Sequence, residues 1–388
     1  MISYGKQYID KNDIKSVEKV LKSDWITQGP KIKEFETKLK KKFKSKFCVA
    51  VANGTAALHL VGLSLGWKSG DIVLTTPISF LASSNCIVYS GATPCFVDID
   101  NFSYTIDVRK LEKKIKLLKK KRKKIGGIVA TDYAGHPSNW EQLKLISRKY
   151  NIPLVNDNCH AMGAKYMNRM GYAVKYADLV TQSYHAVKHI TTGEGGAIFT
   201  NNSKLEKKIR RLSSHGTTKD QKEMFKYDGP WYYEMQDLGY NYRITDIQCS
   251  LGISQIKKLD KFVKRRKEIA GIYNKAFINN EIFSIPKVNK FVEHSYHIYP
   301  LLISFEKLKI SKKVFFKKMI KKNIYLQVHY IPIHLQPFYK KSFNYKIGDF
   351  PVAEKFYKKE VSLPIYYSLR NSQIYKVIKL IKKFCFKI

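Results

Sequence analysis

The stretch Ser183 to Thr200, "SYHAVKHITTGEGGAIFT", places one lysine between a polar segment and a glycine-rich run that leads into an apolar strand. Lys188 is one of 71 lysines and arginines, so on its own it is expected to be a solvated surface charge. An amine that attacks a carbonyl needs a lowered pKa, and apolar, glycine-rich surroundings can desolvate a lysine in that way. Ser183 and Tyr184, shortly before it, suit a phosphate or ring contact if this turn faces the mouth of a sheet.

Short apolar runs alternate with helical patterns around this stretch. Near-continuous apolar strands separated by helices predict a mostly parallel sheet covered by helices on both faces. The alternation ends at one long helical pattern over 248–277, followed by a mixed region. We predict a large α/β domain over residues 1–250 and a small C-terminal α+β domain over residues 251–388. The predicted strands are 46–53, 71–77, 93–100, 125–135, 152–163, 177–186 and 195–201, and the predicted helices include one after Asp10 and those over 54–66, 79–91 and 139–150.

Composition and charge exclude several classes of protein. The six scattered cysteines form no C-x-x-C pair, which argues against a zinc site or a disulfide framework and favours a reducing, cytoplasmic compartment. We expect neither a signal peptide nor a membrane span, because no apolar window is long enough. The formal net charge of +40 invites a nucleic-acid interpretation. The lysines are spread along the chain without an RNA-binding motif, so we expect charged helix surfaces, no nucleic-acid partner and a mild attraction for anionic substrates.

Polar residues that follow apolar strands are the candidate site, because ligands of open α/β sheets bind beyond the carboxyl ends of the strands. Gly54, Thr55 and Ala56 open a helix and can cradle a phosphate, or form a plain turn with the threonine as helix cap. Asp157 can hold a protonated ring nitrogen, and His160 can lie against a flat ring; the alternative is a capping aspartate with a half-buried histidine. Two further candidates are Phe80, as a ring stack or a core residue, and the polar turn containing Asn241 and Arg243.

The order of these signals indicates a cofactor. A phosphate cradle, an aromatic ring, a strand-end aspartate and a glycine-flanked lysine are the anchor, stack, electron-sink partner and amine that a pyridoxal phosphate (PLP) enzyme requires. At these residues the chain resembles the DegT/StrS-type family of nucleotide-sugar aminotransferases, which have the aspartate-aminotransferase fold (fold type I). The motifs that carry the resemblance include "NGTAALHL", "TTPISFLASSN", "NDNCHAMGA", "SYHAVKHITTGEGGAIFT", "GYNYRITDIQCSLG" and "VHYIPIH".

The resemblance implies roles for individual residues. Lys188 would form the Schiff base with PLP, Asp157 would pair with the ring nitrogen, and Phe80 would stack on the ring. Asn241 would reach across a homodimer to the phosphate of the neighbouring cofactor. The phosphate would be held by Gly54, Thr55, Ala56 and Ser183; His160 would contact the cofactor; and substrate contacts are expected from Thr27, Tyr184, His329 and Tyr330. No metal is expected.

The resemblance also implies a substrate. His160, where many members of the family have glutamine, and "VHYIPIH" are similar to the branch that aminates UDP-4-keto-6-deoxy-N-acetyl-L-altrosamine in pseudaminic acid biosynthesis, with glutamate as donor and 2-oxoglutarate as product. His189 departs from that branch, which tends to have proline there. A further branch of the family has histidine in place of the catalytic lysine and dehydrates its substrate. Because this chain retains Lys188, the resemblance implies transamination. Another UDP-, dTDP- or GDP-linked 3- or 4-keto sugar and, more remotely, an inactive nucleic-acid-binding relative are the alternatives.

Overall fold

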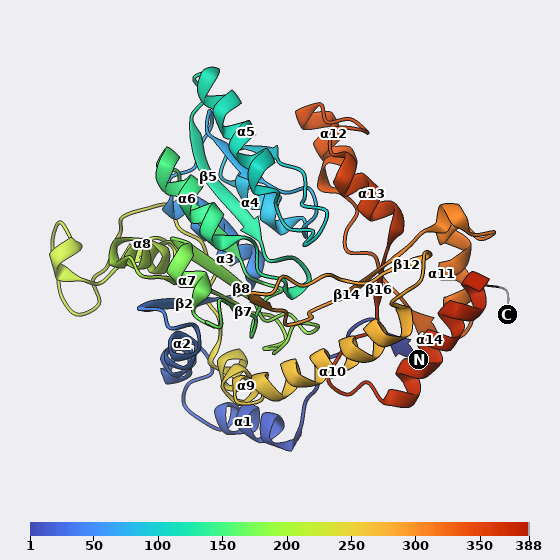
Figure 1. Cartoon of the computed structure of the whole chain (residues 1–388). Helices are drawn as coiled ribbons and strands as arrows, with labels where there is room; N and C mark the ends of the chain where they lie inside the picture. The colour runs from blue at the N-terminus through green and yellow to red at the C-terminus, as the bar shows by residue number, and fades with distance from the viewer. Residues whose placement is uncertain (387–388) are drawn as a thin grey trace.

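A seven-stranded sheet forms the centre of the large lobe in this computed structural model, which describes residues 1–386 (Figure 1). The predicted strands and the mostly parallel sheet are confirmed. β9 alone runs antiparallel to both of its neighbours, because the turn after β8 contains no helix to carry the chain across the sheet. The strand order is β2 (Phe47–Val51), β9 (Gly196–Thr200), β8 (Leu179–Ser183), β6 (Leu154–Asp157), β5 (Ile125–Thr131), β3 (Ile72–Thr75) and β4 (Thr93–Phe96).

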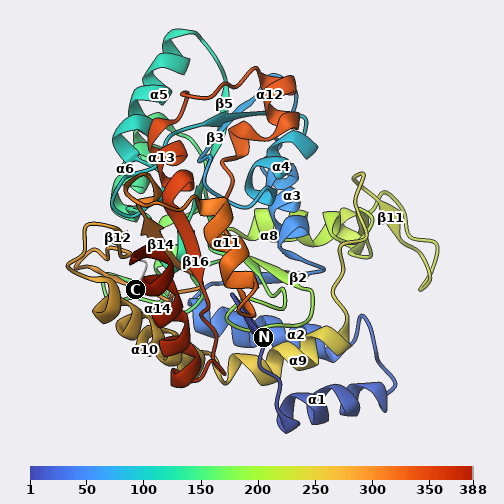
Figure 2. The same ribbon diagram turned by 90° about the vertical axis from the view of Figure 1, so that its right-hand side faces the viewer.

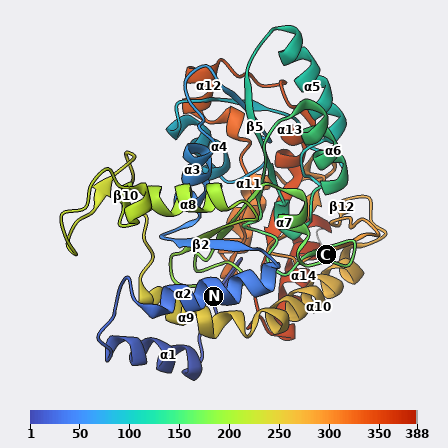
Figure 3. The same ribbon diagram turned by 90° about the vertical axis from the view of Figure 1, so that its left-hand side faces the viewer.

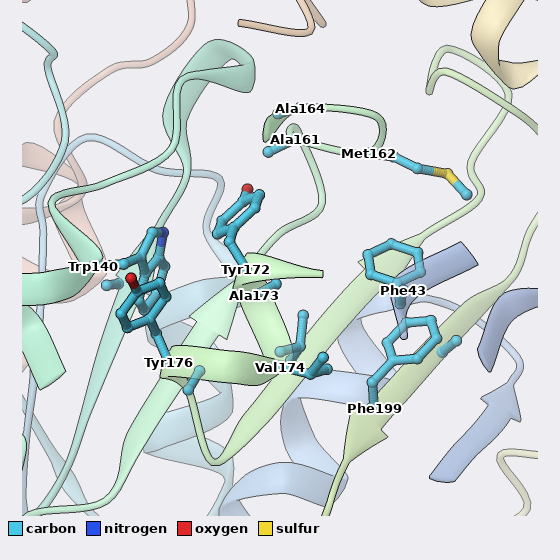
Figure 4. Packing of buried hydrophobic residues seen from close by; sticks show 14 of the residues in the cluster. Phe43, Trp140, Ala161, Met162, Ala164, Tyr172, Ala173, Val174, Tyr176 and Phe199 are labelled. Carbon is cyan, nitrogen blue, oxygen red and sulfur yellow. The ribbon is translucent and has the colours of Figure 1, made fainter. Parts of the chain in front are cut away.

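Helices cover both faces of this sheet, as predicted. Alternate strand residues serve the two faces: Val49 and Val51 pack in one core, and Cys48 and Ala50 in the other. Figure 4 shows the second core, where Phe43 stacks on Phe199 with ring centroids 4.3 Å apart. The first face carries α3 (Gly54–Ser64), α4 (Ala82–Tyr89) and α8 (Ser203–Leu212), and the second α2 (Pro30–Phe43), α5 (Val108–Lys120), α6 (Trp140–Tyr150), α7 (Tyr172–Tyr176) and α9 (Asp246–Ile256).

The prediction of one long helix over 248–277 is wrong in one respect. The structure has two helices there, α9 and α10 (Leu259–Phe277). The break falls at Lys258, whose ammonium lies 2.7 Å from carboxylate oxygens of both Asp10 and Asp13. Asp10 caps α1 (Lys11–Leu21), which packs against α9. The end of α9 is therefore held against α1, while α10 continues toward the second lobe.

The second lobe contains a three-stranded antiparallel sheet in the order β12 (Phe283–Ser284), β14 (Tyr299–Ile303), β16 (Glu360–Leu363) (Figure 2). The N-terminus belongs to this lobe, because β1 (Ile2–Ser3) pairs with β15 (Ile324–Tyr325) and Ile2 lies in its core. The division at residue 250 stays a prediction. The lobe's helices are α10, α11 (Lys312–Ile320), α12 (Pro337–Phe343), α13 (Pro351–Lys359) and α14 (Asn371–Phe386), and its 3-10 turns are η3 (Phe305–Lys307) and η4 (Ile333–Leu335).

A hairpin arm, residues 217–238, projects from the large lobe (Figure 3). Its strands β10 (Thr217–Thr218) and β11 (Glu234–Met235) are antiparallel, with η2 (Gln221–Glu223) between them. Three of its apolar side chains are strongly exposed: Phe225 by 94%, Leu238 by 77% and Trp231 by 73%. The remaining small elements are η1 (Tyr133–Gly135) and the antiparallel pair β7 (Lys165–Tyr166) and β13 (Val292–Glu293).

All six cysteines are free, as expected. Within residues 1–386, none of the helices combines the length and the apolar character that a membrane crossing requires.

Candidate active site

A cavity of about 960 Å³ lies where the parallel strands end and the second lobe begins. This is the edge at which open α/β sheets bind ligands, and the volume is in the range of small-molecule sites. The cavity brings together most of the predicted site residues: Gly54, Thr55, Ala56, Phe80, Asp157, His160, Ser183, Lys188, His329 and Tyr330.

Lys188 lies in the loop between β8 and β9, half-buried at the cavity. Its backbone N–H donates to the carbonyl of His185 at 2.9 Å, so the loop forms a tight turn. Burial lowers the pKa of the Lys188 ammonium below its usual value, while Cys159 and Asp157 act in the opposite direction. A lysine with a lowered pKa is a better nucleophile at neutral pH, as carbonyl chemistry requires.

Asp157 is the last residue of β6, in register with Thr131 and Thr181 on the neighbouring strands. Its carboxylate accepts hydrogen bonds from the Ser83 hydroxyl and from the Cys159 N–H, the latter at 3.3 Å. A turn follows it instead of a helix, so the capping alternative does not apply. Ser83 was missed from the sequence, because the helical spacing of 79–91 did not show which side chains face β6.

The predicted phosphate cradle lies at the start of α3, where Asn53, and not Thr55, caps the helix. The Asn53 side chain accepts the Ala56 N–H at 2.8 Å, which leaves the N–H groups of Gly54 and Thr55 without an intrahelical partner. A Cβ added at Gly54 would lie 2.8 Å from the Cβ of Ser183, so only glycine allows this close approach. Of the four predicted phosphate holders, Ala56 therefore contributes a small side chain and no free N–H.

His160 and Tyr330 join the two lobes across the cavity. The Ala134 N–H donates to His160 Nδ1 at 3.3 Å, so Nε2 carries the ring proton and donates to the Tyr330 hydroxyl at 3.0 Å. The Tyr330 hydroxyl is then free to donate its own proton into the cavity. Burial holds the pKa of His160 well below its usual value, so the ring is neutral. Phe80, 55% exposed, lies beside them with its ring centroid 6.0 Å from that of Tyr330.

Three predicted residues lie outside this cavity. Tyr184 is fully buried and packs edge-on against Phe35 at 5.4 Å, so the predicted substrate contact is wrong; neighbouring residues of an extended chain face opposite ways, and Ser183 is the one at the cavity. Thr27 and Asn241 are exposed. Each forms an isolated antiparallel β-bridge, Thr27 with Thr245 and Asn241 with Ser214. Their roles toward a partner subunit stay predictions.

Several cavity residues were missed from the sequence. Tyr4 reaches the cavity because β1 pairs with β15, a contact across more than 300 residues for which no local pattern exists. Tyr89, Tyr242 and Gln336 also line it. Tyr242 lies within the "GYNYR" motif, which could have indicated it.

The residues at the cavity fit pyridoxal phosphate. They supply an amine, a carboxylate for the ring nitrogen, an exposed aromatic ring and a cradle that a Cβ on Gly54 would fill. Within the described part of the chain, no group of three or more His, Cys, Asp and Glu side chains is placed to share a metal ion.

Comparisons with known proteins cover nearly the whole chain. Residues 7–382 match the DegT/DnrJ/EryC1/StrS aminotransferase family. The chain is 42% identical to the uncharacterized protein MJ1066 of Methanocaldococcus jannaschii, over 97% of this chain and 95% of that protein. It is 38% identical to a UDP-4-amino-4,6-dideoxy-N-acetyl-beta-L-altrosamine transaminase of Campylobacter jejuni, over 99% of each chain.

Two solved structures have the same fold. Helicobacter pylori PseC, an aminotransferase involved in the biosynthesis of pseudaminic acid, superimposes with a TM-score of 0.89 at 32% identity over 100% of both chains. The PLP form of the putative sugar aminotransferase Spr1654 from Streptococcus pneumoniae superimposes with a TM-score of 0.89 at 28% identity, over 100% of this chain and 99% of that one.

Proposed function

This chain belongs to the DegT/DnrJ/EryC1/StrS aminotransferase family, and from that premise we propose a PLP-dependent transfer of the glutamate amino group to the 4-keto carbon of UDP-4-keto-6-deoxy-N-acetyl-β-L-altrosamine. The sugar aminotransferase activity and the cofactor come with the family. The altrosamine substrate is supported by the Campylobacter jejuni and Helicobacter pylori relatives. The observation that carries the chemistry is the meeting of Lys188 and Asp157 in one cavity beside the Gly54 cradle.

We assign each residue a task from its place at the cavity. When bound, PLP supplies an electron sink for the negative charge that develops at the amine-bearing carbon. Lys188, with its lowered pKa, takes and returns the proton at that carbon. Asp157 would hold a proton on the ring nitrogen, and Gly54 and Thr55 would donate their N–H groups to the phosphate. From the second lobe, the Tyr330 hydroxyl would donate to the sugar.

A panel of keto sugars tests the substrate. The purified enzyme, with glutamate as donor, should aminate the UDP-linked 4-keto altrosamine derivative with a higher kcat/KM than dTDP- or GDP-linked 4-keto sugars or 3-keto sugars. Formation of 2-oxoglutarate and of the amino sugar is measured by mass spectrometry. Equal kcat/KM values over the panel would remove the altrosamine assignment and leave the transaminase.

We further propose that the enzyme acts in the cytoplasm as a homodimer with shared active sites. The six free cysteines suit a reducing compartment. Asn241 and Thr27 are exposed and outside their own chain's cavity, and the hairpin arm carries exposed Phe225 and Trp231. An arm with such side chains is expected to pack on a partner.

Co-expression of Asn241→Ala and Lys188→Ala chains tests the sharing. If Asn241 serves the partner's site, each mixed dimer has one intact site, because the Lys188→Ala chain lends its asparagine to the other chain's lysine. Activity should then recover above that of either variant alone. If Asn241 acts within its own chain, both sites of the mixed dimer are defective and no recovery occurs.

A further inference from the structure

A chain of three polar side chains runs from the cavity into the second lobe: His329, Ser362 and Glu360. His329 Nδ1 lies 2.7 Å from the Ser362 hydroxyl, and that hydroxyl lies 2.5 Å from Glu360 Oε1. The other carboxylate oxygen accepts the backbone N–H of His329 at 2.9 Å. Ser362 and Glu360 are both fully buried on β16. This row of hydrogen-bonded side chains is therefore closed to water at the Glu360 end and reaches the cavity at the His329 end.

His329 is the residue at the open end. It lines the cavity and is 6% exposed, and its Nε2 forms no hydrogen bond with any residue over 1–386. Burial, with the nearby charge of Lys188, lowers the pKa of His329 to about 3, so the ring carries one proton at neutral pH. A neutral imidazole donates through one nitrogen and accepts through the other. The position of this one proton decides what His329 offers to a substrate.

Counting the protons gives two arrangements. If Glu360 is ionised, the Ser362 hydroxyl donates to Glu360 and must accept from His329 Nδ1–H, so Nε2 faces the cavity as an acceptor. If Glu360 is protonated, it donates to Ser362, which then donates to Nδ1, so His329 faces the cavity with an Nε2–H donor. Oε2 of Glu360 accepts the His329 backbone N–H in both arrangements.

We propose that Glu360 and Ser362 are positioning residues that set the tautomer of His329, and so decide whether this part of the site accepts or donates a hydrogen bond. An accepting Nε2 would bind a sugar hydroxyl or an acetamido N–H, and a donating one a sugar oxygen. This role in substrate recognition rests on the proposed function. The two hydrogen bonds that link His329 to Ser362 and Ser362 to Glu360 are independent of the proposed function.

The groups around Glu360 keep both arrangements within reach. Lys312 of α11 contributes a positive charge, which favours the ionised carboxylate, and its ammonium donates to the carbonyl of Tyr357 at 2.6 Å. From η1, the Tyr133 hydroxyl donates to the carbonyl of His329 at 2.5 Å, and Tyr330 lies next in the chain. Burial raises the pKa of Glu360 to about 8. The change of tautomer is thus expected in mildly alkaline solution.

Glu360→Gln is the sharpest variant. Its amide oxygen must accept the His329 backbone N–H, so its NH₂ group donates to Ser362 and reproduces the protonated state permanently. Nitrogen-15 NMR of histidine-labelled holoenzyme reads the tautomer directly, with the signal assigned by its loss in His329→Gln. In the wild type, the proton should move from Nε2 at about pH 6 to Nδ1 at about pH 9. In Glu360→Gln it should stay on Nε2 at both pH values, and Ser362→Ala should abolish the coupling.

Glu354→Gln is the matched control, because Glu354 contacts a buried histidine, His334, at 3.0 Å outside the cavity. It should leave the pH response of His329 unchanged. The KM for the keto sugar should vary with pH by roughly tenfold in the wild type and not in Glu360→Gln. The proposal is overturned if His329 has the same tautomer in wild type and Glu360→Gln at about pH 9, or if the KM responses are identical. The NMR experiment uses no sugar, so it can fail while the aminotransferase activity stands.

Discussion

The cavity has two walls of different origin. We call Gly54, Asp157, Ser183 and Lys188 the sheet wall, and His329 and Tyr330 of the second lobe, with Ser362 and Glu360 behind them, the lobe wall. His160 of the large lobe bonds to Tyr330 across the cavity. Sheet-wall residues lie at or just after the ends of strands of the large lobe, where each strand end presents polar groups at one edge. Lobe-wall contacts join segments 31, 33 and 170 residues apart. We infer from this difference that the sheet wall serves the cofactor and the lobe wall the substrate, so variants of the two should fail differently.

The largest effect is expected at the sheet wall from Asp157→Asn. The amide keeps the shape of the carboxylate but loses the charge that holds a proton on the ring nitrogen, so kcat should fall by about 10²- to 10³-fold. Stopped-flow measurement of the glutamate half-reaction checks this, with Ser83→Ala as the milder control. A kcat within a few-fold of the wild type would show that Asp157 is not the ring partner.

Gly54→Ala should weaken cofactor binding with less effect on kcat at saturation. Its new methyl group would lie 2.8 Å from the Ser183 Cβ, and such overpacking should raise the Kd for PLP by about tenfold to hundredfold. Gly271→Ala in α10 is the matched control, since nothing lies within 4 Å of the added Cβ. Titration of both apoenzymes with PLP separates them, and equal affinities would refute the cradle.

Tyr330→Phe tests the lobe wall. The loss of a hydroxyl that donates to the sugar should raise the sugar KM by roughly fivefold to tenfold, while PLP affinity and the glutamate half-reaction stay unchanged. Tyr345→Phe removes a hydroxyl that donates to the Pro94 carbonyl at 3.0 Å outside the cavity, and is the control. If Tyr330→Phe impairs PLP binding as strongly as sugar binding, the division between the walls fails.

The smallest effect concerns the stability of the lobe wall against pH. The pKa of Glu360 is raised by burial from 4.5 to about 8, so the folded state binds this proton more tightly than the unfolded chain. The resulting stabilisation is complete below pH 4.5 and is lost as pH rises through about 8. Burial lowers the pKa of Lys312 to about 8, so its contribution to stability increases with pH. That contribution changes only above about pH 8. Relative to Glu360→Gln, the wild-type Tm should drop by several degrees between about pH 5 and 8; parallel Tm curves would contradict this.

Much of the sheet wall could be predicted from sequence, because strand periodicity places Asp157 at an edge and glycines mark the close approach at Gly54. Sequence could not predict the antiparallel direction of β9, the break at Lys258 or the burial of Tyr184. Each depends on which surface the chain meets after folding. The lobe wall shows the same limit. Nothing near His329 in sequence points to Glu360, and resemblance to a family supplied His329 and Tyr330 without their partners.

The central claim is that Lys188 carries the cofactor. The most direct measurement is borohydride reduction of the PLP-loaded enzyme, followed by proteolysis and mass spectrometry of the labelled peptide. The pyridoxyl group should be found on Lys188 and on no other lysine, and Lys188→Ala protein should give no labelled peptide and no transamination. Label on another lysine, or transamination by the Lys188→Ala protein, would contradict the account.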